Sequence, residues 1–327
     1  MKAAWYERQG AAADVLVVGS MPDPEPAPGE VRIRLAASGI NPGDVKKRQD
    51  AFGYGMAYPR VIPHSDGAGM IDRVGSDVPP TRLGEHVWCY GAQSYRAYGT
   101  AAEYVAVPAA QAVPLADDIA FEQGACLGIP GITAHRAVHV AGDIAGMTVL
   151  VQGGAGAVGQ CAIALARHAG ARVIATVRSS ADQAIASEAG AHEIVPARAE
   201  AQEIVQRIRS VAPDGVDHVI EVAFHANVEI DAAVLRNGGS IATYASGEPK
   251  PHVPFWPLVF KNVAIHFLGS DDFPPRAKEE AARDINAALA AGWKGFAIGA
   301  RYPLDRIAAA HERVEDAAQP GRTVLVV

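Results

Sequence analysis

The chain has 327 residues, of which 49% are hydrophobic and 20% charged, and its formal net charge is −7. This length predicts about two domains, each able to bury a core, and the acidic balance argues against a protein built to hold nucleic acid. Three cysteines exclude a disulfide-stapled scaffold and favour a reducing compartment. The first residues lack the apolar segment of a secretory signal, and no apolar run reaches about 18 residues, so we expect a cytoplasmic protein with no membrane span.

Up to about residue 120 the sequence is typical of short strands and turns. Apolar and basic residues alternate over 31–35, which is the period of a half-buried strand. Segments 69–75 and 102–107 are similar, and a cluster of prolines at 22–28 marks a turn region. We therefore expect a mainly β domain here.

From about residue 124, predicted strands alternate with predicted helices. A strand at 148–151 ends in glycines, and a helix with apolar residues at helical spacing follows at 157–169. Further strands are predicted at 172–177, 193–195, 216–222, 240–244, 263–268 and 323–327, and further helices at 181–189, 200–211, 228–236, 275–291 and 304–317. This alternation indicates βαβ units and a parallel sheet.

A glycine-rich turn between the first of these strands and its helix is the most informative segment. It contains G-x-G-x-x-G at Gly154, Gly156 and Gly159, and a second strand follows within about 30 residues. Glycines permit the tight turn and the close approach of backbone N–H groups to a pyrophosphate, and the helix N-terminus attracts that anion. An ordinary glycine-rich loop is the alternative. We predict a dinucleotide site comprising Gly153, Gly154, Ala155, Gly156, Ala157, Val158 and Gly159.

The second strand of this unit ends without the acidic residue that NAD sites usually carry about 20 residues after the turn. No acidic residue occurs between Gly159 and Asp182, and the strand is followed by Arg178 and Ser179. A guanidinium and hydroxyls suit a 2′-phosphate, which a carboxylate would repel. The sequence therefore predicts NADPH, with Arg178 and Ser179 as ligands; the alternative is that Arg178 is a solvated loop residue.

These residues, with their surroundings, resemble the medium-chain dehydrogenase/reductase superfamily, and within it the zinc-free quinone oxidoreductase, zeta-crystallin-like branch. The matching stretches are ASGINP (37–42), SDGAG (65–69), GIPGITA (128–134), GAHE (190–193), VIEV (219–222) and YPL (302–304). The resemblance implies an α/β protein, with a GroES-like β-barrel substrate domain from residues 1–123 and 264–327. It makes residues 124–263 a doubly wound, parallel-sheet Rossmann domain. It also implies a homodimer, or a tetramer, through the Rossmann edge strand at 263–268.

The resemblance also locates the positions at which zinc alcohol dehydrogenases of this superfamily carry ligands. They are occupied by Asn41, Ser65 and Ile129, none of which is a thiolate, imidazole or carboxylate. His64 and Cys126 lie nearby, but binding through them would need a register shift, and the eleven histidines show no spaced pair with a credible third ligand. We predict no metal. His64 replaces the glycine that relatives often carry, and its plainest interpretation is a loop histidine.

Without a metal, reduction of an already electrophilic quinone or conjugated enone is less demanding than alcohol oxidation. By resemblance, Asn41 and Thr133 orient the nicotinamide, and Tyr54 stacks on a flat acceptor or donates to its oxygen; the alternative for Tyr54 is a surface-turn aromatic. Asp44 is expected at a helix N-terminus, and 46–48 on a solvated helix face. The cofactor site is completed by Val222, Tyr244, Leu268 and Arg322.

The sequence thus predicts an NADPH-dependent oxidoreductase that transfers hydride to a quinone or related conjugated carbonyl. Two alternatives stay open. One is an enoyl or 2-alkenal double-bond reductase, and the other is a non-catalytic NADPH-binding protein with a structural or RNA-binding role. The acidic charge and the absence of a basic stripe disfavour nucleic acid as a partner.

Overall fold

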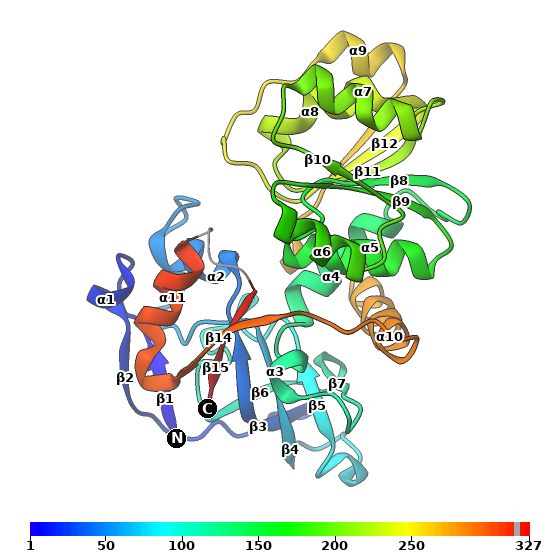
Figure 1. Cartoon of the computed structure of the whole chain (residues 1–327). Helices are drawn as coiled ribbons and strands as arrows, with labels where there is room; N and C mark the ends of the chain where they lie inside the picture. The colour runs from blue at the N-terminus through cyan, green and yellow to red at the C-terminus, as the bar shows by residue number, and fades with distance from the viewer. Residues whose placement is uncertain (317–320) are drawn as a thin grey trace. The chain divides into compact units, whose positions relative to one another are not determined.

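The computed structural model describes residues 1–316 and 321–327 (Figure 1). It separates into two compact units. The first unit contains Met1–Pro130 and Gly295–Val327, and the second contains Gly131–Lys294. Each unit has its own sheet and its own buried core, so they are described separately.

The first unit is built on a largely antiparallel sheet, as the alternating segments predict. Seven strands form it in the order β14-β15-β3-β4-β5-β7, with β6 pairing to β3, and β1 and β2 form a separate pair. The strands are β1 (Lys2–Trp5), β2 (Val17–Ser20), β3 (Glu30–Gly39), β4 (Asp66–Val74), β5 (His86–Cys89), β6 (Tyr104–Pro108), β7 (Ala112–Pro114), β14 (Ile298–Pro303) and β15 (Arg322–Val326). The helices of this unit are α1 (Ala12–Val15), α2 (Pro42–Gln49), α3 (Phe121–Gly124) and α11 (Ile307–Glu315).

Two C-terminal elements differ from the sequence prediction. Strand β14 is absent from the sequence prediction, because the alternation in IGARYP is short and includes glycine and proline, which are disfavoured in strands. It pairs in parallel with β15 at the end of the sheet. The helix expected over 304–317 is α11, preceded by a 3₁₀ turn at Leu304–Arg306. Residue 317 of that prediction lies outside the described residues.

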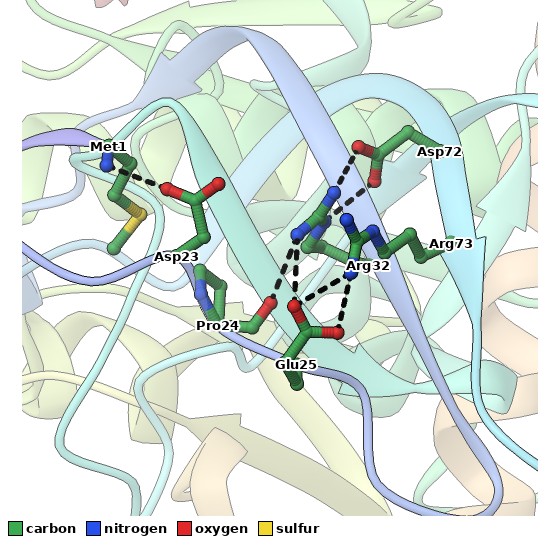
Figure 2. A network of polar contacts seen from close by, with 7 residues as sticks. All are labelled: Met1, Asp23, Pro24, Glu25, Arg32, Asp72 and Arg73. Atoms are coloured by element: carbon green, nitrogen blue, oxygen red, sulfur yellow. Dashed lines mark hydrogen bonds and ion pairs between the residues drawn. The ribbon is translucent and has the colours of Figure 1, made fainter.

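The proline-rich segment at 22–28 is attached to β3 and β4 by a polar network (Figure 2). Arg32 is buried and donates to both carboxylate oxygens of Asp72, at 2.9 and 2.7 Å. It also donates to the carbonyl of Pro24 at 3.4 Å, while Arg73 donates to Glu25 at 2.7 and 2.8 Å. The buried cation is thus paired bidentately, which compensates much of its desolvation.

The second unit contains the predicted parallel sheet. Its order is β10-β9-β8-β11-β12-β13, which is the doubly wound arrangement with β8 as first strand and a switch point between β8 and β11. The strands are β8 (Thr148–Val151), β9 (Arg172–Val177), β10 (Glu193–Pro196), β11 (Val216–Glu221), β12 (Leu235–Thr243) and β13 (Ala264–Phe267). The sequence predicts all six strands, because runs of β-formers alternate with glycine-terminated helices. Strand β12 begins at Leu235 rather than at 240, and the helix expected over 228–236 is α8 (Phe224–Val234), which begins and ends earlier.

Helices cover both faces of this sheet (Figure 1). They are α4 (Gly128–His139), α5 (Ala157–His168), α6 (Ser180–Glu188), α7 (Ala201–Val211), α8 (Phe224–Val234), α9 (Phe255–Phe260) and α10 (Pro275–Ala290). Helices α7 and α8 pack together on one face, and α5 packs against α6 and α10 on the other. Among the described residues, no helix combines the length and apolarity needed to cross a bilayer.

The division between the units differs from the boundaries expected from sequence. Strand β13 pairs with β12 in the parallel sheet, and α10 packs on α5. Both elements therefore lie in the second unit, although the expected boundary at 263/264 left them outside it. At the other end the division falls inside α4, at 130/131 rather than 123/124.

Candidate functional site

The glycine turn after β8 has the geometry that a bound pyrophosphate requires. Gly153 has φ +69°, in the left-handed region that glycine adopts without strain. A Cβ at Gly159 would lie 2.3 Å from the carbonyl oxygen of Gly153, so only glycine lets α5 start this close to the turn. Helix α5 begins after Gly156 with no side-chain cap, which leaves its first N–H groups available to an anion. The observed cradle therefore fits a dinucleotide.

The other predicted cofactor residues of the second unit lie at the same edge of its sheet. Each directly follows the carboxyl end of a strand, and in a parallel sheet these ends share one edge, where ligands of doubly wound folds bind. The residues and the strands they follow are Arg178 (β9), Val222 (β11), Tyr244 (β12) and Leu268 (β13). A Cβ at Gly153 would lie 2.9 Å from Cγ1 of Val222, so the glycine turn lies directly beside the residue that follows β11.

Arg178 and Ser179 stand at the N-terminus of α6. Arg178 is exposed, and Oγ of Ser179 accepts from the backbone N–H of Asp182 at 3.2 Å, which makes Ser179 the helix N-cap. A free guanidinium at a helix N-terminus is an environment that favours an anion. Thr133 also belongs to this unit, as a buried residue of α4.

A buried polar network supports the first glycine of the turn. The N–H of Gly153 donates to Oγ1 of Thr176 at 3.1 Å, and that hydroxyl donates to Oε1 of Gln152 at 2.6 Å. Nε2 of Gln152 donates in turn to Oδ1 of Asp231 at 2.8 Å. The network ends at Glu221, the last residue of β11, so it connects the turn to the neighbouring strand.

Asp231 and Glu221 are two buried carboxyl groups that act on each other electrostatically. Burial raises the pKa of both groups, and the charge of Glu221 raises that of Asp231 further. Oδ2 of Asp231 and Oε2 of Glu221 are buried and have no hydrogen-bond partner among the described residues, so a proton held on Asp231 and directed at Glu221 would satisfy both. Oε1 of Glu221 accepts from the N–H of Ala223 and, at 3.0 Å, from Asn227. Because Glu221 receives the larger number of donors, it is the carboxylate and Asp231 the neutral acid.

In the first unit, Asn41 is a buried residue whose side chain is held at both ends. Its Nδ2 donates to Oδ2 of Asp66 at 2.6 Å, and its Oδ1 accepts from Nη2 of Arg322 at 2.8 Å. The backbone N–H of Asn41 donates to Asp44 at 2.7 Å, so Asp44 does lie at a helix N-terminus, that of α2. Nε of Arg322 is buried without a hydrogen-bond partner among the described residues. The cluster thus presents a fixed amide and an unsatisfied donor.

Asp66 is fully buried beneath this amide. Burial raises its pKa to about 7, while the hydrogen bonds from Asn41 and from the backbone N–H of Ile129 act in the opposite direction. Both carboxylate oxygens lie 2.9 Å from that N–H. A Cβ at Gly128 would lie 2.1 Å from Oδ1 of Asp66, so glycine there allows the start of α4 to approach the carboxylate.

His64 lies in a loop, as the sequence predicts, and its side chain is completely buried. Its φ of +78° lies in the left-handed region, which costs a non-glycine residue about 1–2 kcal/mol and explains why glycine suits this position. Its imidazole bonds Ser38 Oγ and His311 Nε2, each at 2.9 Å. Two buried hydrogen bonds therefore compensate the backbone strain.

Arg48 sets the direction of the hydrogen bonds through these histidines. The expectation of a solvated face at 46–48 is wrong for Arg48, which is fully buried and bonds Glu315. Its Nε donates to Nδ1 of His311 at 3.4 Å, so Nε2 of His311 donates to His64, which donates onward to Ser38. Burial lowers the pKa of both imidazoles, that of His311 to about 3, so both are neutral.

Tyr54 lies in an exposed turn. Its side chain is 89% exposed, and its ring is stacked against Phe52 with 6.2 Å between centroids. The flanking Gly53 and Gly55 have φ of +71° and +68°. This placement corresponds to the surface-turn alternative, and its role toward an acceptor stays a prediction.

The structure brings together one group of candidate metal ligands that the sequence interpretation did not identify. His135 and His139 are four residues apart on α4, and the structure brings Asp284 of α10 to them. The i, i+4 histidine spacing was a usable signal. The third residue, 149 positions from His135, could not be identified without the fold.

Comparisons with known proteins identify the family to which this fold belongs. The family described as "Alcohol dehydrogenase GroES-like domain" matches residues 27–117, and the one described as "Zinc-binding dehydrogenase" matches residues 157–283. Quinone oxidoreductase of Mus musculus is 32% identical over 93% of this chain and 91% of its own length; the Homo sapiens protein is 30% identical over the same shares. A mycobacterial protein solved in complex with NADPH has a TM-score of 0.86 and 26% identity, covering both chains completely.

The zinc that the second description implies does not fit the corresponding residues of this chain. The Asn41 amide is already engaged by Asp66 and Arg322, Ser65 offers only a hydroxyl, and Ile129 has an apolar side chain. Tetrahedral zinc in proteins takes thiolate, imidazole or carboxylate ligands. These three positions therefore cannot form a catalytic zinc site of the alcohol dehydrogenase kind.

Proposed function

Because the chain belongs to the quinone oxidoreductase branch of the medium-chain dehydrogenase/reductase superfamily, we propose that it reduces a quinone or related conjugated carbonyl with NADPH, without a catalytic metal. The proposal rests on the glycine turn at Gly153–Gly159 together with the residues at the positions where zinc alcohol dehydrogenases carry their ligands. In this chain those positions are occupied by Asn41, Ser65 and Ile129, which do not bind zinc. A nicotinamide cofactor supplies hydride when bound. An acceptor that is already electrophilic needs no Lewis acid to receive it.

NADPH rather than NADH is proposed as the donor. Arg178 is exposed, Ser179 is the N-cap of α6, and the sequence has no acidic residue between Gly159 and Asp182. The α6 N-terminus adds a favourable field for a 2′-phosphate. The proposed remaining contacts of the second unit are Thr133, Val222, Tyr244 and Leu268.

In the first unit, Asn41 and Arg322 are proposed to orient the nicotinamide and the acceptor oxygen. The fixed amide can do so without a change of charge, and the buried Nε of Arg322 offers a donor that a bound oxygen would satisfy. Such a preorganised donor stabilises negative charge that develops on an acceptor oxygen. Tyr54 is proposed as a further contact to the acceptor.

We further propose a homodimer formed through β13. That strand lies at the edge of the six-stranded sheet and bears Phe267, 72% exposed. Next to it in sequence, α9 exposes Phe255 and Trp256, each 62%, and Phe260, 74%. Exposed aromatics beside an unpaired strand edge are typical of an interface.

Turnover tests the proposal. Purified protein should oxidise NADPH when given members of a panel of quinones and conjugated enones. Activity with enones alone would favour a double-bond reductase, and tight NADPH binding without oxidation by any acceptor would contradict the enzyme proposal.

A further inference from the structure

Helices α4 and α10 of the second unit bring together three side chains of types that bind metals, two histidines and one aspartate. His135 and His139 share one face of the helix, and their rings lie 4.6 Å apart between centroids. Nε2 of His135 lies 2.8 Å from Oδ2 of Asp284. One ligand atom from each of the three residues lies within 4.8 Å of the other two.

The backbones that carry these side chains are held by close helix packing. Gly131 lies one turn before His135, and Ile285 directly follows Asp284. A Cβ at Gly131 would lie 2.5 Å from Cδ1 of Ile285, so glycine makes room for this side chain of α10. The two helices thus meet directly beside the ligand atoms, and the cluster is prearranged by apolar packing rather than by its own polar contact alone.

Carboxylates lie close to the two imidazoles. Besides Asp284, the carboxylates of Asp143 and Glu280 act electrostatically on His139. Arg276 is paired with Glu280 at 2.8 Å, which leaves the other two carboxylates to face the imidazoles. Two imidazoles with nearby carboxylates attract a divalent cation.

We propose that His135, His139 and Asp284 bind one divalent cation of the zinc class, with a fourth position open to water. Tetrahedral ligands at 2.0–2.1 Å are about 3.3 Å apart, so side-chain rotation suffices to form the site. His135 is buried, whereas the Asp284 side chain is 48% exposed, which provides a route of entry. The cation joins α4 to α10 and stabilises the second unit. It uses none of the residues at the alcohol dehydrogenase zinc positions, and it takes no part in the proposed hydride transfer.

The test uses the full chain after removal of metals by a chelator. Titration with Co²⁺ should produce visible ligand-field absorption that saturates at one ion per chain and is displaced by Zn²⁺. Saturating Zn²⁺ should also raise Tm by about 5 °C, whereas Mg²⁺, which prefers oxygen ligands, should not.

Three variants locate the site. His139→Ala and Asp284→Ala should each weaken Co²⁺ binding by about tenfold or more and remove the zinc effect on Tm. His168→Ala, at an exposed histidine of α5, should bind as the unaltered chain does. Equal Co²⁺ spectra in all four proteins, or a chain that gives neither absorption nor a Tm shift, would overturn the proposal. NADPH oxidation by the stripped protein is an independent readout, so failure of the cation site and failure of the proposed function are distinguishable.

Discussion

The buried pair of Asp231 and Glu221 allows a quantitative test of how the cofactor turn is supported. Asp231→Asn keeps both hydrogen bonds, because an amide oxygen still accepts from Gln152 and an amide nitrogen donates to Glu221. Asp231→Ala leaves the Gln152 donor and the Glu221 acceptor without partners. Each unsatisfied buried group costs about 1–3 kcal/mol, so the alanine variant should lose about 2–6 kcal/mol of stability. At neutral pH the asparagine variant should be at least as stable as the unaltered chain, because it leaves neither group unsatisfied and has no carboxyl proton to retain on folding.

The pH dependence of the unaltered chain and of the asparagine variant should then diverge. Folding raises the pKa of Asp231, so the folded chain holds a proton that the unfolded chain releases. The stability contributed by this group therefore falls as pH rises above the ordinary carboxyl range, until the raised pKa is reached. The amide of the Asp231→Asn variant has no such proton to hold, so the stability of this variant relative to the unaltered chain should improve by up to about 1.4 kcal/mol per pH unit.

Urea unfolding followed by circular dichroism from about pH 6 to about pH 9 measures both effects, with NADPH affinity as a second readout. Asp214→Asn, at an exposed aspartate, serves as the control and should reproduce the pH profile of the unaltered chain. The alanine variant should also bind NADPH more weakly, because Gln152 loses the contact that holds it against Thr176 and the turn. If Asp231→Asn destabilises the chain as much as Asp231→Ala at every pH, the assignment of Asp231 as the neutral acid is wrong.

Four further outcomes are expected. Arg178→Ala should weaken NADPH binding by about tenfold or more in fluorescence titrations, because a charged hydrogen bond at an exposed site is lost, and should barely change NADH binding. Equal losses of NADPH and NADH affinity would contradict the pairing of Arg178 with the 2′-phosphate. Arg48→Leu should lower the free energy of unfolding by about 3 kcal/mol or more, since it strands Glu315 and His311, whereas the control Lys46→Ala should cost less than about 1 kcal/mol in the same melts. Carboxyl NMR should show an aspartate that titrates near pH 7, and this titration should be absent in Asp66→Asn. Because folding raises the pKa of Asp66, its contribution to stability should fall as pH rises from about 4 to 7. A titration of Asp66 near pH 4 would contradict the raised pKa. Phe267→Glu should yield monomers in light scattering if β13 forms the proposed dimer, and an unchanged mass would exclude that interface.

The parallel sheet of the second unit and most of its helices could be predicted from the sequence, because their signals are local, whereas α4 and α9 were not predicted. Runs such as TVLV at 148–151 end in glycines, and the helices between them end at glycines such as Gly170 and Gly190. The order of the strands follows from the βαβ rule once these elements are identified. The same rule brings the residues after each strand to one edge, which is why the predicted cofactor residues of this unit lie together.

What could not be predicted depends on partners far away in the chain. The sequence around Arg48 predicts a basic, solvent-exposed run. Its hydrogen-bond acceptor, His311, lies 263 residues later in the chain and is identified only from the fold. His64 likewise acquires a buried role through a residue 247 positions away. Strand β14 lies at a sheet edge, and its half-exposed residues alternate only with Gly299, Arg301 and Pro303, which give a weak strand signal.

Transfer of deuterium from cofactor to acceptor tests the central claim most directly. Chelator-treated protein with its metal content measured should be mixed with NADPH dideuterated at C4 and a conjugated enone or quinone. We expect NADPH oxidation to be slower than with unlabelled cofactor, and deuterium to appear on the β-carbon of any enone reduced, at a rate unaffected by removal of metal. A reaction that disappears with the metal and returns with zinc, or a reduced enone that contains no deuterium, would contradict metal-free hydride transfer by this chain.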